Sequence, residues 1–201
     1  MEVTGVVLAG GKSRRLGRDK AVEPIDDRPL IGRVIDVLAN VADESVVVVD
    51  EAERGRELPL PPSTQIVTDL YPCGGSLGGI FTGLTAARNE WAVVAACDMP
   101  FLNVRLLDHL LSQRSDSDAV VPVLDGRPEP THAAYSKACL PHMERRLKAG
   151  DLKISGFFDD VRVAFVPQEA VESLDPDRLS FFNINTQQDL DRALGLVAEG
   201  R

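Results

Sequence analysis

Glycines and cations gather in one short stretch near the beginning of the sequence. Gly10 and Gly11 follow an apolar run at residues 3–8, and five cations come next: Lys12, Arg14, Arg15, Arg18 and Lys20. Glycine lets a backbone approach a ligand closely, and the N–H groups of such a turn can surround phosphate oxygens. Because the cations would neutralise several negative charges, this phosphate loop (residues 8–20) predicts a triphosphate-binding site.

Two familiar phosphate-binding motifs do not fit the phosphate loop. The pattern G-x-x-x-x-G-K-[ST] needs a glycine five positions before Gly11, where Val6 stands. The dinucleotide pattern G-x-G-x-x-G fails because Gly10 and Gly11 are adjacent. On these residues alone, an ordinary strand-to-helix turn with a solvated basic face is the alternative.

Carboxylates follow three of the predicted strands, at Asp50, Asp69 and Asp98. A carboxylate beside a triphosphate is a suitable ligand for Mg²⁺, which takes hard oxygen ligands and bridges them to phosphate. Asp98 directly follows an apolar strand and precedes Pro100, so it is the best candidate for the metal ligand. The alternative for each carboxylate is a turn or capping residue in a loop.

Apolar segments with strand and helix periodicity alternate along the chain. Strands are expected at residues 3–8, 45–49, 65–68, 91–96, 119–123 and 161–166. Helices are expected at 30–38, 103–114, 136–148 and 186–198, and a glycine-rich turn at 74–79 leads into a helix through residue 88. The segment between 123 and 136 is expected to be less regular. This alternation predicts one α/β domain over residues 1–201, with a mostly parallel sheet, helices on both faces, and ligands at the carboxyl ends of strands.

The composition is that of an acidic globular protein of 201 residues, 44% hydrophobic, with a formal net charge of −9. Such acidity argues against nucleic acid or an anionic membrane as a partner, and it makes the basic phosphate loop a local exception. The three cysteines form no C-x-x-C pair, so neither a disulfide framework nor a zinc site is predicted. We expect no signal peptide and no membrane span, and therefore a cytoplasmic location.

The phosphate loop resembles the signature L-A-G-G-x-S-x-R-hydrophobic-G-x-D-K of nucleotidyltransferases with a Rossmann-like, three-layer fold. It is most similar to the MobA-like guanylyltransferases, which make molybdenum cofactor guanine dinucleotide. The resemblance implies that the loop wraps the triphosphate of GTP, and it assigns nucleotide binding to Leu8, Ala9, Gly10 and Gly11. It also implies that Arg15 and Lys20 hold the pyrophosphate that leaves.

The same resemblance assigns roles to the three carboxylates. C-D-M-P-F-L around Asp98 matches the metal-aspartate motif of the family, which makes Asp98 the Mg²⁺ ligand. Asp69 stands where the family has an aspartate that contacts the nucleotide. At Asp50 the family often has an asparagine that reads guanine. A carboxylate can accept both N1–H and N2–H₂ of guanine, whereas cytosine offers one donor group beside two acceptors, so guanine is favoured. A solvated loop aspartate is the alternative at this position.

Three motifs resemble the side of the family's site that binds the acceptor. E-P-T-H-A-A-Y includes His132, which would contact a pterin phosphate or, as the preferred alternative, fill a hydrogen-bonded structural position. F-F-N-I-N-T includes Asn183 and Asn185, which would contact the pterin, with turn and cap chemistry as the alternative. Lys153, three residues after Gly150, would face the acceptor phosphates.

The resemblance covers residues 5 to about 190 and implies a Mg²⁺-dependent nucleotidyl transfer. A phosphate oxygen of molybdenum cofactor (molybdopterin) would attack the α-phosphorus of GTP, and pyrophosphate would leave. Positioning and charge neutralisation would supply most of the catalysis. The alternatives are a CTP-dependent molybdopterin cytidylyltransferase, a guanylyltransferase for another phosphorylated cofactor precursor, and a non-catalytic carrier of nucleotide or cofactor. L-A-G-G argues against the cytidylyl branch. Cofactor-delivery proteins are compatible partners.

Overall fold

The computed structural model describes residues 2–10 and 19–200. Within them the strands are β1 (Val3–Leu8), β2 (Pro24–Ile25), β3 (Arg28–Pro29), β4 (Glu44–Val49), β5 (Gln65–Thr68), β6 (Trp91–Ala96), β7 (Ala119–Leu124), β8 (Arg127–Pro128), β9 (His132–Ser136) and β10 (Val163–Val166). The α-helices are α1 (Leu30–Leu38), α2 (Ala52–Glu57), α3 (Gly75–Ala86), α4 (Val104–Ser112), α5 (Leu140–Lys148), α6 (Gln168–Leu174) and α7 (Gln187–Ala198). Short 3₁₀ helices are η1 (Lys20–Val22), η2 (Lys137–Cys139), η3 (Ile154–Asp160) and η4 (Leu179–Phe181).

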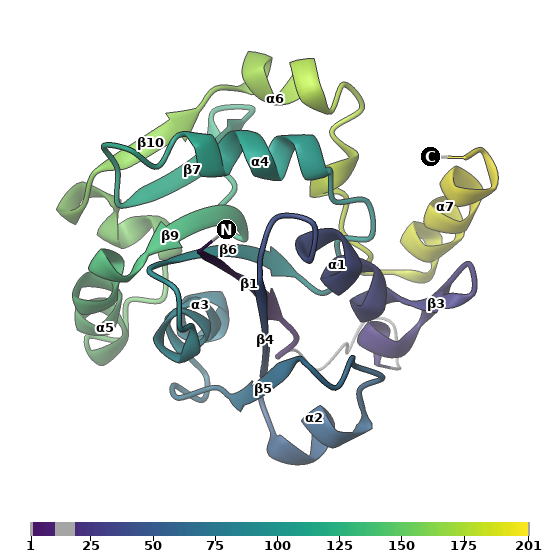
Figure 1. Ribbon diagram of the computed structural model, residues 1–201, viewed down its shortest axis with the longest axis horizontal. Coiled ribbons are helices and arrows are strands. Elements are labelled where there is room, and N and C mark those ends of the chain that lie inside the picture. The colour runs from purple at the N-terminus through teal and green to yellow at the C-terminus, as the bar shows by residue number, and fades with distance from the viewer. Residues whose placement is uncertain (1, 11–18, 201) are drawn as a thin grey trace.

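One mixed sheet organises the fold (Figure 1). Its strands lie in the order β10-β7-β9-β6-β1-β4-β5, and β8 pairs with the end of β7. β1 runs parallel to both β4 and β6, β4 runs parallel to β5, and β7 runs parallel to β10. Valine and alanine dominate the central strands because helices cover both faces of the sheet. The mostly parallel α/β sheet predicted from the sequence is confirmed.

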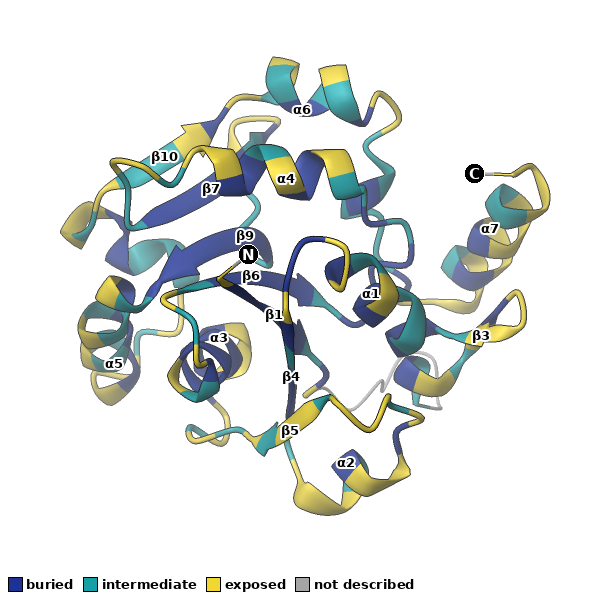
Figure 2. Cartoon of the chain, viewed as in Figure 1, coloured by how far each residue is buried: buried dark blue, intermediate teal, exposed yellow. Residues whose placement is uncertain are grey.

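Helices on the two faces of the sheet give the protein two apolar cores. In β1, Val7 packs in a core with α1, α4 and α6, whereas Val6 packs in a second core with α3 and α5. Neighbouring residues of a strand point to opposite faces, so one strand supplies both cores. Figure 2 shows the result as buried strands in the centre and exposed surface on the outer sides of the helices.

The central strand β9 corrects the expectation of a less regular segment followed by a helix from residue 136. β9 pairs antiparallel with β6 and β7, and α5 begins only at Leu140. All residues of β9 are buried, so it lacks the alternation of exposed and buried positions that identifies many strands. Its alanines favour helices in isolation, and pairing with two neighbouring strands outweighs that preference.

The glycine-rich stretch at residues 74–79 corrects a second expectation. Instead of a turn that precedes a helix, it contains the beginning of α3, which starts at Gly75 and ends at Ala86. A Cβ atom added to Gly83 of this helix would lie 2.3 Å from a methyl group of Val6. Glycine thus lets the helix lie directly against β1, and this packing outweighs the low helix propensity of glycine.

Adding one methyl group at residue 83 should therefore destabilise the protein. In Gly83→Ala the new atom would overlap Val6, and overpacking of this kind typically lowers the free energy of unfolding by about 1–3 kcal/mol. Urea unfolding followed by circular dichroism measures the change. Gly195→Ala in α7 is the matched control, because a Cβ there meets nothing within 4 Å and should not destabilise the helix. A Gly83→Ala protein as stable as the wild type would contradict the close packing of α3 on β1.

A separate small core joins the early and late parts of the chain. Its buried members come from β2, α1, α7 and the segment before α7: Ile25, Leu30, Ile184, Leu190 and Ala193. Figure 1 shows α7 beside β3 and away from the main sheet. Thr186 caps α7, and its side chain and that of Asp189 each accept a hydrogen bond from the other's backbone N–H.

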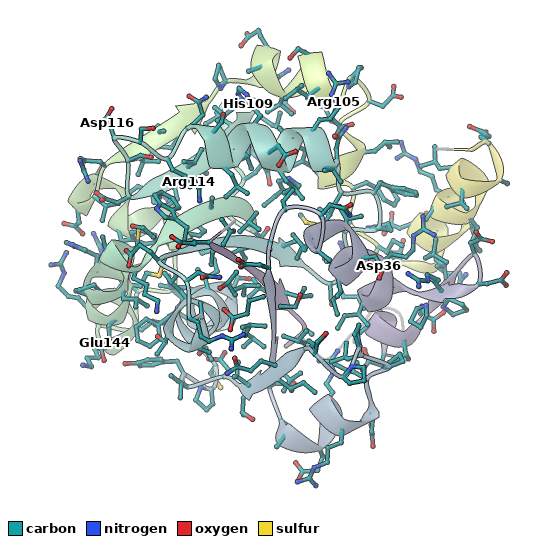
Figure 3. All side chains as sticks on the ribbon, viewed as in Figure 1. Asp36, Arg105, His109, Arg114, Asp116 and Glu144 are labelled. Carbon is teal, nitrogen blue, oxygen red and sulfur yellow. The ribbon has the colours of Figure 1, made fainter. Side chains whose placement is uncertain are left out.

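Charged side chains lie around the outside of the molecule. Figure 3 labels Asp36 on α1, Arg105 on α4, Asp116 before β7 and Glu144 on α5. Asp36, Arg105 and Glu144 belong to helices whose apolar faces pack on the sheet, and Asp116 lies in the turn before β7. Of the helices in the described residues, none has both the length and the apolar character needed to cross a bilayer.

Candidate active site

The carboxyl ends of β1, β4, β5 and β6 meet at one edge of the sheet. Backbone hydrogen bonds continue past the strands there, from Cys97 N–H to the Leu8 carbonyl (3.0 Å) and from Asp69 N–H to the Val49 carbonyl (2.8 Å). Parallel strands bring their carboxyl ends together, which is where such folds bind ligands. The three carboxylates predicted at strand ends lie along this edge: Asp50, Asp69 and Asp98.

The phosphate loop leaves β1 at the same edge. Ala9 is buried, and its N–H donates to the Val48 carbonyl at 2.8 Å. Gly10 is exposed and passes close to the next strand, because a Cβ added to it would lie 3.4 Å from Asp50 N. The predicted site residues Gly11 and Arg15 lie outside the described residues.

Lys20 and Asp98 form the centre of the site. Lys20 Nζ lies 2.5 Å from Asp98 Oδ2, and the two side chains are 17% and 13% exposed. Lys20 Nζ also donates to Asn185 Oδ1 at 3.2 Å. The backbone supports this arrangement, because Ile184 N–H donates to the Asp98 carbonyl at 3.0 Å. The structure thus joins the phosphate loop, the aspartate after β6 and the asparagine segment near the C-terminus in one cluster.

The surroundings of the second carboxylate oxygen of Asp98 indicate whether the cluster could bind a metal ion. Oδ1 is buried, and it has no hydrogen-bond partner in the part of the chain that the structure describes. That same part contains no group of three or more His, Cys, Asp and Glu side chains that could hold a metal. Mg²⁺ commonly uses one or two carboxylates together with phosphate oxygens and water. A single unpartnered carboxylate oxygen beside a phosphate loop fits that ligand set.

Arg54 of α2 links two carboxylates beside the cluster, those of Asp19 and Asp50. Its guanidinium donates to Asp19 through Nε (3.0 Å) and Nη2 (2.8 Å), and Nη1 lies 3.4 Å from Asp50 Oδ1. Burial lowers the pKa of Arg54, but the hydrogen bonds and the charge of Asp19 outweigh that effect and leave the pKa raised. Arg54 was not predicted as a site residue from the sequence, because α2 has six residues with a glycine among them and was not predicted either.

Asp69 is hydrogen-bonded both to the segment before α3 and to α3 itself. Its Oδ1 accepts hydrogen bonds from Tyr71 N–H and from Thr82 Oγ1, both at 2.9 Å. A Cβ on Gly78 would lie 3.2 Å from Asp69 Oδ2, so this glycine leaves room for the carboxylate. A small hollow opens beside it, lined by Leu8, Gly10, Val48, Asp69, Gly75, Ser76 and Gly79.

His132 is fully buried at the start of β9. Its ring packs against Phe181 with 4.7 Å between ring centroids, and neither ring nitrogen has a hydrogen-bond partner among the described residues. Burial lowers its pKa to about 4, so the ring is neutral at pH 7. The buried, packed ring is compatible with the preferred structural role, and a contact between His132 and an acceptor stays a prediction.

The other residues predicted on the acceptor side lie in different surroundings. Asn185 is exposed beside Lys20, whereas Asn183 is half-buried and donates to the Phe181 carbonyl at 3.0 Å. Lys153 is exposed just before η3, a helix that packs on α5. Its side chain makes no hydrogen bond or ion pair with any described residue, so Asn185 alone of these residues contacts the central cluster.

Comparison with known proteins identifies the family of this site. The family model described as MobA-like NTP transferase domain matches residues 5–163. The molybdenum cofactor guanylyltransferase of Desulfosudis oleivorans is 37% identical over 201 residues, which cover 99% of this chain and 98% of that protein. A probable molybdenum cofactor guanylyltransferase of Pelotomaculum thermopropionicum is 36% identical over 201 residues, which cover 100% of this chain and 96% of that protein.

A solved structure agrees with these sequence relatives. The crystal structure of molybdopterin-guanine dinucleotide biosynthesis protein A from Archaeoglobus fulgidus superimposes with a TM-score of 0.82 at 30% identity. The match covers 98% of this chain and 99% of that chain, and it confirms the predicted nucleotidyltransferase fold. The chain is therefore a nucleotidyltransferase that belongs to the MobA-like NTP transferase family.

Proposed function

We propose that this protein transfers GMP from GTP to the phosphate of molybdenum cofactor (molybdopterin) and releases pyrophosphate. The observation that carries the proposal is the cluster of Lys20, Asp98 and Asn185, because two residues predicted to act on the nucleotide contact one predicted to bind the acceptor. Relatives named molybdenum cofactor guanylyltransferase align over nearly the full length of both chains, which supports the same reaction.

In this proposal a divalent cation and cationic side chains bind the phosphates of GTP. Asp98 would hold Mg²⁺, since its Oδ1 is buried without a partner among the described residues. When bound there, the ion would neutralise part of the phosphate charge and polarise the α-phosphate. Lys20 and Arg15 would hold the leaving pyrophosphate, together with N–H groups of the phosphate loop. A phosphate nucleophile is already ionised at pH 7, so the reaction needs no general base from the protein.

Recognition of the base would fall to Asp50. Its carboxylate can accept hydrogen bonds from N1–H and N2–H₂ of guanine, and charged acceptors strengthen such bonds. Gly10 lies against Asp50 and also lines the small hollow at the strand ends. Asp69 would contact the nucleotide from the lining of the same hollow, and this residue is partly exposed.

The acceptor would bind beside the C-terminal asparagine segment. Asn185 is the best supported contact, because it is exposed and already accepts a hydrogen bond from Lys20 at 3.2 Å. Asn183, Lys153 and His132 complete the proposed acceptor side on the basis of their motifs. We also propose that the protein acts in the cytoplasm and that other proteins deliver the cofactor to it.

The purified protein should form molybdopterin guanine dinucleotide from GTP but no dinucleotide from CTP. Parallel incubations would contain Mg²⁺, molybdopterin or molybdenum cofactor, and one of the two nucleotides, with the products identified by mass spectrometry and pyrophosphate measured by a coupled assay. Incubation with EDTA is the control for the metal. Product from CTP alone would overturn the base assignment, and no product from either nucleotide would overturn the proposed acceptor.

A further inference from the structure

Arg54 lies between the two parts of the nucleotide site, where its side chain is 15% exposed. One edge of the guanidinium makes two hydrogen bonds to Asp19, at 3.0 and 2.8 Å. The remaining nitrogen lies 3.4 Å from Asp50 Oδ1, four residues earlier in the sequence. A planar group with donors on several edges can satisfy two carboxylates in this way, whereas the ammonium of lysine cannot reproduce the paired hydrogen bonds.

Each carboxylate that contacts Arg54 has a second role in the site. Asp19 Oδ1 accepts a hydrogen bond from Ala21 N–H at 3.0 Å and so caps η1, the helix that begins with Lys20. Asp50 ends the strand next to the phosphate loop, and Gly10 packs against its backbone. Arg54 therefore connects the residue proposed to read the base with the turn that carries Lys20.

The contact with Arg54 also restricts the carboxylate of Asp50. Oδ1 faces the guanidinium, while Oδ2 forms no hydrogen bond with any described residue. Gly10 lies close to Asp50, because a Cβ added to this glycine would lie at ordinary contact distance, 3.8 Å, from Asp50 Cβ. A guanine that pairs with a carboxylate needs both oxygens in the plane of the base, so a fixed carboxylate binds it with less loss of side-chain entropy.

We infer that Arg54 is a positioning residue for guanine recognition, which holds the Asp50 carboxylate in place and ties it through Asp19 to the turn that carries Lys20. The inference rests on the proposed function, because it presupposes that Asp50 reads guanine. It also predicts that Arg54 contributes to the preference for guanine only when residue 50 carries a negative charge. An asparagine at that position carries no charge, and so it would not need the guanidinium to balance it.

The test compares GTP with ITP, which lacks the N2 amino group of guanine. Isothermal titration of the full chain with each nucleotide and Mg²⁺ gives the ratio of the two dissociation constants. The wild type should prefer GTP by about tenfold or more, as expected for a hydrogen bond to a charged acceptor. Arg54→Met and Arg54→Lys should each reduce that preference by about fivefold, because neither side chain makes the paired hydrogen bonds.

Asp50→Asn provides the second half of a double-mutant cycle. In that background Arg54→Met should change the ratio of GTP to ITP affinity by less than about twofold, since the charge that Arg54 balances is gone. Arg56→Met is the matched control, because Arg56 is exposed on the same helix. Circular dichroism and thermal unfolding would establish that each variant is folded.

The outcomes separate this inference from the proposed function. A wild type that binds GTP and forms the dinucleotide, with an unchanged GTP-to-ITP ratio in Arg54→Met, would overturn the role of Arg54 alone. Equal weakening of GTP and ITP would indicate a merely structural role and would also overturn it. A wild type that neither binds GTP nor forms product would instead overturn the proposed function.

Discussion

Replacing Asp98 with asparagine should lower the rate of GMP transfer by about 10³-fold, the upper range for loss of one group that stabilises developing charge in a transition state. Asparagine keeps the shape of the side chain but removes its negative charge. It would weaken the attraction for a divalent cation at Oδ1 and remove the ionic partner of Lys20, which lies 2.5 Å from Oδ2. Both effects act at the position proposed for the α-phosphate.

The measurement is the turnover rate of Asp98→Asn at saturating GTP over a range of Mg²⁺ concentrations. Asp108→Asn is the control, because Asp108 is an exposed carboxylate on α4. Thermal unfolding of both variants would exclude loss of the fold as the cause. A turnover rate within tenfold of the wild type at every Mg²⁺ concentration would contradict the assignment of Asp98 as the metal ligand.

Removing the ammonium of Lys20 should lower kcat/KM by about 10²-fold or more. In Lys20→Met the side chain keeps a similar length, so the main loss is the positive charge beside the proposed phosphates. Lys20→Arg should restore little activity, because a planar guanidinium cannot place its charge and donors as the compact ammonium does between Asp98 and Asn185. Charge alone would therefore not be enough, and the position of the charge would matter.

Steady-state kinetics of the Lys20 variants would separate binding from chemistry. Stabilisation of the leaving pyrophosphate predicts a fall in kcat as well as in kcat/KM, whereas a contact made equally in the ground state would raise only KM. Lys148→Met is the control, because Lys148 is an exposed lysine on α5. An unchanged kcat in Lys20→Met would limit Lys20 to binding of the substrate and contradict its catalytic role.

The sequence was sufficient to predict the strands that carry the site. β1, β5 and β6 begin and end where the apolar pattern predicts. In β1 and β6 this pattern is the apolar run typical of buried parallel strands, whereas β5 is a short, mostly exposed strand at the sheet edge. The position of each carboxylate at a strand end follows from that pattern alone. The three carboxylates lie near one another because the strands are parallel and their carboxyl ends meet at one edge.

The pairing within the site could not be predicted in the same way. The motifs identify Lys20 and Asn185, but their contact joins residues 165 positions apart and depends on how α7 and the small core fold. Arg54 lies on a short helix whose Gly55 packs so closely on Ile66 that a Cβ would lie 2.6 Å from it. Because tertiary packing rather than local propensity stabilises such a helix, neither α2 nor its arginine has a clear signal in the sequence.

The small core at the end of the chain has a consequence for how a bulky product leaves. Few apolar side chains hold α7 and the segment before it, so this region should open at a lower free-energy cost than the sheet beneath Asp98. An opening that separates Ile184 from Asp98 would carry Asn185 away from Lys20 and leave the strand ends intact. The proposed dinucleotide product is larger than either substrate, and an opening on this flank would give it room to leave while the strand ends keep their positions.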